Sequence, residues 1–210
     1  MHWPTAIPDF PLESLPKNLA PLMPPETLWT EAIRATQSRD DGNPSAVVML
    51  FVPAEVGAAD AQIVLMRRSV SVATHKGQIS FAGGRKNPDD PTPVATALRE
   101  LEEELGVPPA EVIPVGLLPP TPSMNRQPVF PLVALTTRKL SAMCPAPAEV
   151  AEVFAAPWRQ LSLDRDQVFR FNIFGNWRTS HLFVTSPGPG AASNRIWGLT
   201  AAILHSAALA

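Results

Sequence analysis

The sequence predicts an α+β domain built around a mixed β-sheet, and three observations lead to this prediction. Short β-rich segments lie both before and after one strongly amphipathic helix, an arrangement typical of this class. A second helical segment, at 196–209, closes the chain and is apolar enough to be largely buried. The 210 residues are 45% hydrophobic and 17% charged, so a single domain can bury a substantial core.

The N-terminal part of the chain differs from the rest. Residues 1–44 are interpreted as a proline-rich arm with one helix near 26–37, and residues 45–210 as the folded domain. SAVVMLFVP at 45–53 and AQIVLMRRS at 61–69 are expected to form two strands of a hairpin, because both are rich in β-branched and apolar residues.

The segment GQISFAGG, at 77–84, is expected to form a third, short strand that ends in a glycine turn. After the central helix, further strands are expected at 111–118, 129–137, 168–174 and 181–185.

The clearest predicted helix spans 93–105. Its apolar residues recur at the spacing of one helical face, and they are Val94, Ala97, Leu98, Leu101 and Leu105. Thr92 followed by Pro93 suits the N-cap and the first helical position. Gly106 suits the end of the helix.

Composition excludes several classes of function. The net charge is −2 and no basic tract is present, so nucleic acid is not expected as a partner. The single Cys144 excludes an internal disulfide and a Cys-rich zinc site. The chain starts without a secretory signal, and apolar runs such as 47–52 are too short to span a membrane. We therefore expect a cytoplasmic monomer or homodimer that acts on a small molecule.

Three glutamates crowd the end of the predicted helix. Glu100, Glu103 and Glu104 fall within an arc of roughly 100°, away from the apolar stripe. Like charges at this spacing repel one another, and their position near the helix C-terminus adds to the cost. A hard divalent cation such as Mg²⁺ or Mn²⁺ would turn the repulsion into binding. The alternative is a solvated acidic face.

The stretch from Gly84 to Val107 resembles the Nudix hydrolase signature, G-x5-E-x7-R-E-U-x-E-E-x-G-U, in which U is a bulky aliphatic residue. The second half matches position by position at Arg99, Glu100, Leu101, Glu103, Glu104, Gly106 and Val107. The first acidic position is Asp90 instead of Glu, and eight residues instead of seven separate it from Arg99.

An Asp at this position and the longer spacing are also found in the coenzyme A pyrophosphatase subfamily, which this chain resembles. That subfamily also carries an upstream motif close to L-L-T-x-R-S-x-x-L-R-x-H-x-G-Q-V-x-F-P-G-G. This chain reads VLMRRSVSVATHKGQISFAGG over 64–84. The matching residues are Leu65, Arg68, Ser69, His75, Gly77, Gln78, Phe81, Gly83 and Gly84. The departures are Met66, Val72, Ala73 and Ala82. Segments 149–154 and 195–201 also look like this subfamily, so the resemblance runs from about 45 to 205.

The resemblance implies a Nudix-type α/β/α sandwich with a mixed sheet and a catalytic loop–helix–loop. It further implies metal-dependent hydrolysis of the diphosphate bond of coenzyme A or acyl-CoA, giving adenosine 3',5'-bisphosphate and (acyl-)4'-phosphopantetheine. A second hypothesis is a Nudix diphosphatase for a dinucleotide or nucleotide sugar, because Ala73 removes a cation that could meet a phosphate. A third is a catalytically silent nucleotide-binding module, which the presence of all three glutamates disfavours.

The resemblance also assigns roles to residues of the signature helix. Glu100, Glu103 and Glu104 are the expected ligands of Mg²⁺ or Mn²⁺, with Arg99 orienting a glutamate by ion pairing. Glu100 or a later acid serves as general base. Asp90 is expected to brace the loop before the helix.

Outside that helix, Glu149 and Glu152 are candidates for an additional acid, or else are merely exposed acids. The expected substrate-binding residues are Arg68, His75, Gln78, Gly83 and Gly84. For Arg68 the alternative is an ion pair with an internal carboxylate, and for His75 it is a structural role. For Trp158 and Trp197, packing is expected rather than stacking on an adenine ring.

Overall fold

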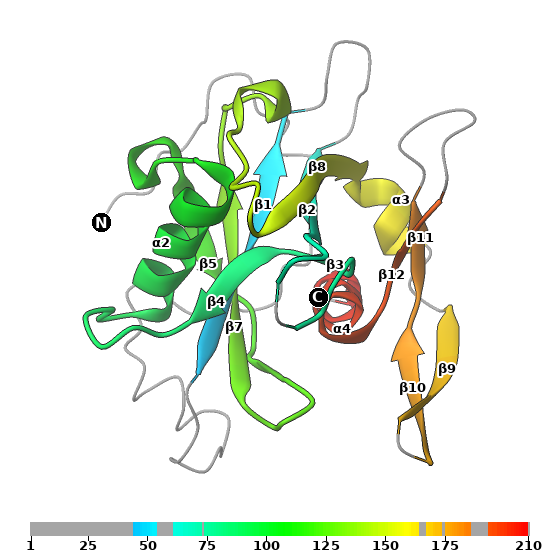
Figure 1. Cartoon of the computed structure of the whole chain (residues 1–210). Coiled ribbons are helices and arrows are strands. Elements are labelled where there is room, and N and C mark those ends of the chain that lie inside the picture. Colours follow the sequence, from blue (N-terminus) through cyan, green and yellow to red (C-terminus); the bar gives the residue numbers. More distant parts are fainter. Residues whose placement is uncertain are drawn as a thin grey trace.

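An eight-stranded mixed sheet forms the centre of the protein (Figure 1). The computed structural model describes residues 44–53, 61–72, 74–163, 167–173, 175–185 and 193–209. The expected arm at 1–43, its helix near 26–37 and Ala73 lie outside the described residues.

The strands of this sheet alternate in the chain with loops and one helix. They are β1 (Ser45–Val52), β2 (Gln62–Arg68), β3 (Ile79–Ser80), β4 (Ala82–Arg85), β5 (Ile113–Leu117), β6 (Thr121–Pro122), β7 (Pro128–Leu135) and β8 (Val150–Pro157). Five of them follow the order β3–β2–β1–β7–β5, while β4 pairs with β1, β6 with β7 and β8 with β2. β1 and β7 are parallel and the other pairings are antiparallel, so the sheet is mixed as predicted.

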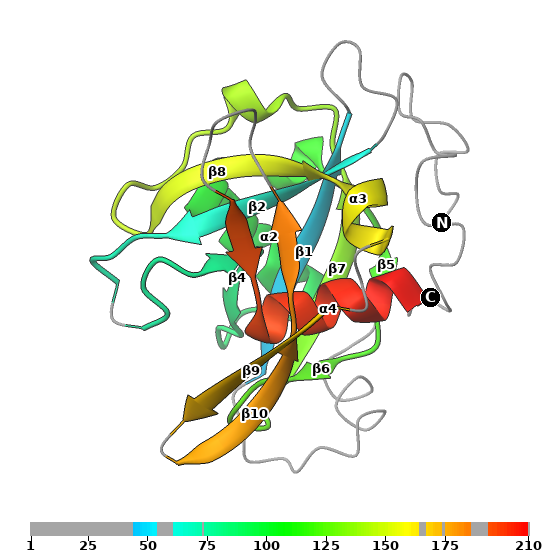
Figure 2. The same cartoon turned by 90° about the vertical axis from the view of Figure 1, so that its right-hand side faces the viewer.

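Helices cover both faces of the sheet, which makes the fold an α/β/α sandwich (Figures 1 and 2). α2 (Pro93–Leu105) packs on one face against β1, β4 and β7, while α3 (Trp158–Leu163) and α4 (Gly198–Leu209) lie on the other. Short 3₁₀ turns occur at Pro109–Glu111 and Leu140–Ala142.

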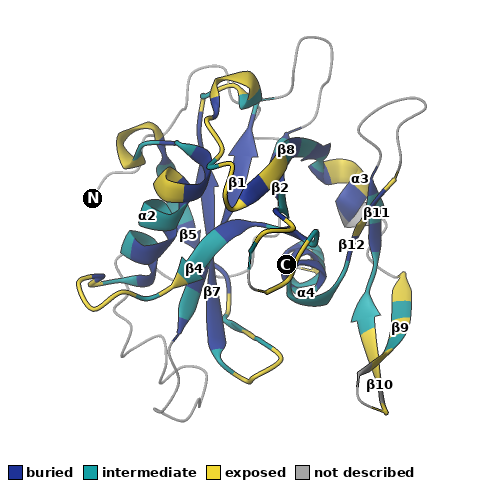
Figure 3. Ribbon diagram, in the orientation of Figure 1, coloured by how far each residue is buried: buried dark blue, intermediate teal, exposed yellow. Residues whose placement is uncertain are grey.

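The alternation of side chains along β1 builds a separate hydrophobic core on each face. Val48 and Leu50 point toward Leu101 of α2, whereas Met49 and Phe51 join the core that includes α4. β1 and β7 are therefore buried on both sides (Figure 3), as expected for the central parallel pair of such a sandwich.

The predicted helix at 93–105 is confirmed at both ends. The Thr92 hydroxyl oxygen accepts a hydrogen bond from Ala95 N at 3.1 Å. Gly106 has a left-handed backbone with φ of 63°, and its N–H donates to the Glu102 carbonyl at 2.9 Å. A left-handed terminal residue favours glycine.

Two small ribbons flank α4. β9 (Val168–Ile173) pairs with β10 (Asn176–His181), and β11 (Phe183–Thr185) pairs with β12 (Asn194–Ile196). The sequence analysis predicted strands at 168–174 and 181–185 but missed β6, β8, β10 and β12. β10 is largely polar, and it forms a strand by pairing along its length with β9. β8 is alanine-rich with Glu152 as its one polar residue, and it forms a strand by pairing along its length with β2. None of the described helices is long and apolar enough to cross a membrane.

Candidate active site

Glu104 lies at the centre of the polar contacts between α2 and the sheet. Its Oε2 accepts a hydrogen bond from Gly83 N at 2.8 Å, and its Oε1 lies 3.4 Å from Nη1 of Arg68. Glu104 is only 2% exposed. The sequence placed it on a face away from the apolar stripe, but β4 covers this end of α2 and buries the carboxylate.

Burial makes the ionised form of this carboxylate costly. Desolvation raises the pKa of Glu104 to about 7, although the N–H of Gly83 and the Arg68 charge oppose the shift. The charges of Glu100 and Glu149 add to it. Burial also raises the pKa of Glu100, with Arg99 opposing and Glu103 and Glu149 adding. Glu100, Glu104 and Glu149 therefore form a mutually repelling cluster.

Arg99 forms ion pairs with three acids, Asp90, Glu100 and Glu103. Its Nη1 lies 2.9 Å from both Glu100 Oε1 and Glu103 Oε2, and its Nη2 lies 3.1 Å from Asp90 Oδ2. The hydrogen bond to Asp90 is the main reason that the pKa of Arg99 is raised. Arg99 thus orients two glutamates at once.

Asp90 braces the loop before α2. It accepts hydrogen bonds from Thr96 Oγ1 at 2.7 Å and from Asn87 N at 2.9 Å. Burial opposes ionisation, but the hydrogen bonds from Arg99, Asn87 and Thr96 prevail and lower the pKa of Asp90. Asp90 is therefore a charged residue whose contacts hold both the loop before α2 and the Arg99 side chain in place.

Gly83 and Gly84 of β4 lie where neighbouring groups approach the backbone too closely to leave room for a Cβ. A Cβ on Gly83 would overlap the Ala46 carbonyl of β1, and one on Gly84 would overlap the Glu100 carboxylate. Gly84 therefore provides the space that the Glu100 carboxylate occupies between β4 and α2.

Alternation along β2 sends its two terminal arginines to opposite faces. Arg68 points with Met66 toward α2 and Glu104. Arg67 instead meets Glu152, its cross-strand neighbour on β8, at 3.0 Å, and donates to Asn194 Oδ1 on β12. Glu152 thus forms an ion pair with Arg67 and is not part of the glutamate cluster. Glu149 lies close enough for its charge to raise the pKa of Glu104.

His75 and Gln78 lie in the turn between β2 and β3. His75 has a left-handed backbone with φ of 57°, and its Nδ1 lies 3.0 Å from Gln78 Oε1. Both side chains are solvent-accessible. The two predicted binding residues therefore form a pair with each other.

The two tryptophans named above behave differently. Trp158 is 4% exposed and packs edge-on against Phe51, with ring centroids 5.9 Å apart, as expected. Trp197 is only half-buried and lines a pocket with Phe169, Phe171, Asn172, Leu182 and Arg195. Sequence reasoning missed this pocket, although the alternating phenylalanines of β9 already placed two rings on one side of a strand.

The donor set fits a divalent cation. Within the described ranges, no group of three or more His, Cys, Asp or Glu side chains is already gathered as a metal site. However, Glu104 is buried and Glu100 is half-buried. Desolvation and then repulsion raise the pKa values of both carboxylates, and Glu149 adds a third negative charge. A cluster of this kind is stabilised by a hard cation with carboxylate ligands.

Comparison with known proteins agrees with this arrangement. The model of the NUDIX domain matches residues 43–174. The chain belongs to the Nudix family. A protein named uncharacterized Nudix hydrolase NudL, from Photorhabdus laumondii, is 35% identical over 80% of this chain and 85% of its own length. The mitochondrial coenzyme A diphosphatase NUDT8 of Mus musculus is 32% identical over 82% of this chain and 81% of its own.

Among solved structures, a MutT/nudix family protein from Enterococcus faecalis matches 86% of this chain and 68% of its own, with 16% identity and a TM-score of 0.46. Family membership makes this chain a Nudix hydrolase, an enzyme of the diphosphatase class that resembles the coenzyme A pyrophosphatase subfamily. Nudix hydrolases bind small nucleotide derivatives and generally use divalent metal ions.

Proposed function

We propose that this Nudix hydrolase cleaves the diphosphate bond of coenzyme A or acyl-CoA. The products are adenosine 3',5'-bisphosphate and (acyl-)4'-phosphopantetheine. The observation that carries the proposal is the buried Glu104 between Gly83 and Arg68, because it joins the upstream subfamily motif to the signature helix. The similarity to NUDT8, whose name describes a coenzyme A diphosphatase, supports the substrate.

Glu100, Glu103 and Glu104 would hold Mg²⁺ or Mn²⁺, with Glu149 as an additional acid. When bound, the cation neutralises diphosphate oxygens and lowers the pKa of the attacking water. Arg99 keeps Glu100 and Glu103 turned toward each other through its Nη1. Asp90 fixes Arg99 in turn.

The substrate diphosphate would lie beside Arg68 and the glycines of β4. Arg68 Nε is buried and has no hydrogen-bond partner among the described residues. A turn of the side chain toward the substrate would let it donate to a phosphate oxygen. His75 and Gln78, in the adjoining turn, supply further polar contacts.

The reaction needs a group that accepts a proton from the attacking water. Water attacks one phosphorus in line, the bond from that phosphorus to the bridging oxygen breaks, and a phosphomonoester leaves. Glu149 is exposed, and its backbone carbonyl is held at 2.7 Å by the N–H of Ser69, next to Arg68. We assign the Glu149 carboxylate as the group that takes the proton, with Glu100 as the alternative base.

A second candidate substrate class is a dinucleotide or nucleotide sugar. It is favoured by the alanine at 73, because the related motif has an arginine at that position. The metal site and the order of bond cleavage are the same for both candidates.

Product analysis tests the proposal. The purified protein is incubated with CoA, dephospho-CoA, ADP-ribose or a dinucleoside polyphosphate in the presence of Mg²⁺ or Mn²⁺, and products are identified by chromatography with mass detection. We expect adenosine 3',5'-bisphosphate from CoA, and loss of the product in Glu104→Gln.

Glu102→Gln is the matched control, because Glu102 is an exposed glutamate of the same helix. It should retain full activity. Turnover of another diphosphate without turnover of CoA would replace the proposed substrate, and no turnover of any of them would favour the silent nucleotide-binding module. A monomeric or homodimeric state and a cytoplasmic location stay predictions.

A further inference from the structure

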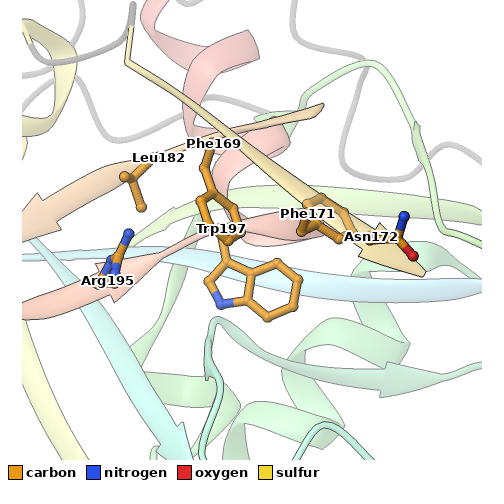
Figure 4. Close-up of a pocket in the computed structure, with 6 residues that line it drawn as sticks. All are labelled: Phe169, Phe171, Asn172, Leu182, Arg195 and Trp197. Atoms are coloured by element: carbon orange, nitrogen blue, oxygen red, sulfur yellow. The ribbon is translucent and has the colours of Figure 1, made fainter. Parts of the chain in front are cut away.

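An aromatic pocket lies outside the glutamate cluster, between the β9–β10 hairpin and the start of α4 (Figure 4). It has a volume of about 390 Å³, within the size range of small-molecule sites. Phe169, Phe171 and Asn172 come from β9, Leu182 follows β10, Arg195 belongs to β12, and Trp197 precedes α4.

Three rings form its apolar part. Phe169 and Phe171 are nearly parallel, with centroids 5.7 Å apart and planes at 12°. Trp197 meets both edge-on, at 6.2 Å from Phe169 and 5.4 Å from Phe171. None of the three is fully buried, unlike Trp158 in the core. Water-accessible clustered rings are typical of a surface that binds a ligand.

Polar groups beside the rings narrow the ligand class. The Arg195 guanidinium carbon lies 5.6 Å from the centroid of Phe169, so a cation is next to an aromatic face. Asn172 adds a side-chain amide at the other end of the pocket. Its Oδ1 accepts a hydrogen bond from Gly175 N at 2.9 Å, so its Nδ2 is the group that would donate to a ring nitrogen of a purine. A planar base with a phosphate attached matches these features, whereas an aliphatic chain would leave Arg195 without an anionic partner.

Side-chain contacts of two adjacent residues of β2 link the pocket to the glutamate cluster. Arg68 contacts Glu104, and Arg67 donates to Asn194, the residue before Arg195. Thr200 Oγ1 of α4 also donates to the Ile79 carbonyl of β3 at 3.2 Å. In Figure 2 the segment between β2 and β3 and the far end of the β9–β10 hairpin extend toward the same side of the molecule.

We propose that this pocket holds the purine base of a nucleotide substrate, with Arg195 neutralising a phosphate outside the diphosphate that is cleaved. The assignment of that nucleotide as the adenosine 3',5'-bisphosphate half of CoA rests on the proposed function. The pocket then sets affinity for the nucleotide half, while the glutamates of α2 perform the chemistry.

The test measures binding of adenosine 3',5'-bisphosphate by calorimetry in EDTA, where no hydrolysis occurs. Loss of a base–aromatic stack or of a cation–phosphate contact weakens binding by roughly 5- to 100-fold. We therefore expect Phe171→Ala and Arg195→Gln each to raise Kd by about tenfold. With CoA as substrate, both variants should raise KM by a similar factor with kcat unchanged, because a group that binds ground and transition states equally affects KM alone.

Arg170→Gln is the matched control, since Arg170 is on the same strand but stacks on Trp177 outside the pocket, at 5.5 Å. It should leave Kd and KM unchanged. Circular dichroism checks that Phe171→Ala folds, and Arg195→Gln on the exposed part of β12 provides an independent variant.

Three binding results would overturn the proposal. These are a Kd unchanged in both pocket variants, an equal loss in Arg170→Gln, or pantetheine binding that depends on the pocket while nucleotide binding does not. If CoA is not hydrolysed but the nucleotide still binds through Phe171 and Arg195, the pocket assignment holds and the proposed function fails. If CoA is hydrolysed with unchanged KM in both variants, the function holds and the pocket assignment fails.

Discussion

The glutamate cluster and the aromatic pocket are built in opposite ways. The cluster depends mainly on one continuous stretch, in which Gly84 of β4 and the glutamates of α2 lie within about two dozen residues of each other. The pocket gathers residues of four segments between 169 and 197. Charge and close approach shape the first region, and aromatic packing shapes the second. The difference suggests that one region controls the chemical step and the other controls affinity.

The largest expected effect follows from removing the space beside Glu100. In Gly84→Ala the added Cβ overlaps the Glu100 carboxylate, which must move. Displacement of a catalytic group by about 1 Å can cost about 100-fold in rate, so we expect kcat for CoA to fall by about that factor. Steady-state kinetics with Gly77→Ala as a comparison, where a Cβ has open space but a left-handed backbone, separates crowding from backbone strain. An unchanged kcat would mean that Glu100 does not need its present position.

The second effect is a pH dependence of stability in the metal-free protein. Burial raises the pKa of Glu104 to about 7 in the folded state, from an ordinary value of 4.5. Between these values the folded state holds a proton that the unfolded chain has released, so stability falls as pH rises. We expect the free energy of unfolding to drop by roughly 2 kcal/mol between pH 4.5 and 8 from this group, given 1.36 kcal/mol per pKa unit and residual solvation.

Urea unfolding in EDTA across this pH range measures that slope. Glu104→Gln should reduce it, and saturating Mg²⁺ should flatten it in the wild-type protein because the cation favours the ionised carboxylate. An identical slope in the wild type and the variant would show that Glu104 is not the titrating group. No comparable effect is expected from Phe171→Ala, because the pocket rings do not titrate.

The third prediction compares the two arginines of β2. Arg68→Met leaves the buried carboxylate of Glu104 without its cation, and partial exposure of Arg68 limits the cost to about 1–2 kcal/mol at pH 8. Arg67→Met loses a more exposed pair with Glu152 and also leaves the buried Asn194 Oδ1 without its donor, so it should cost about 1–2 kcal/mol at both pH values. Thermal unfolding at pH 8 and at pH 5 checks this, because only the Arg68 variant should recover stability when Glu104 is protonated.

The smallest effect is expected for Glu152→Gln. The Glu152 carboxylate pairs with Arg67 on an exposed part of the sheet, so loss of the charge should change stability by less than about 1 kcal/mol. Activity should be retained, whereas Glu149→Gln should lower kcat. A matched loss of kcat in both variants would contradict the assignment of Glu149 as the additional acid.

Much of the fold could be predicted because its signals are local. The ends of α2 follow from Thr92 and Gly106, and the central strands follow from apolar runs that are buried on both faces. β10 could not be predicted in this way, because its polar residues form a strand only by pairing with β9. β8 is rich in alanine, which has no strong strand preference, and it forms a strand by pairing with β2. The burial of Glu104 could not be predicted from the sequence either, because it depends on the packing of β4 against the end of α2.

By itself the sequence determined the helix, the glutamate spacing and the family, because helix caps, apolar periodicity and a contiguous motif act over a few residues. Only the tertiary structure decided which glutamates are buried, that Arg67 and Arg68 serve opposite faces, and that Trp197 joins two phenylalanines in a pocket. Contacts of this kind join residues far apart in the chain. They are set by how strands pair and how layers pack, which no local pattern encodes.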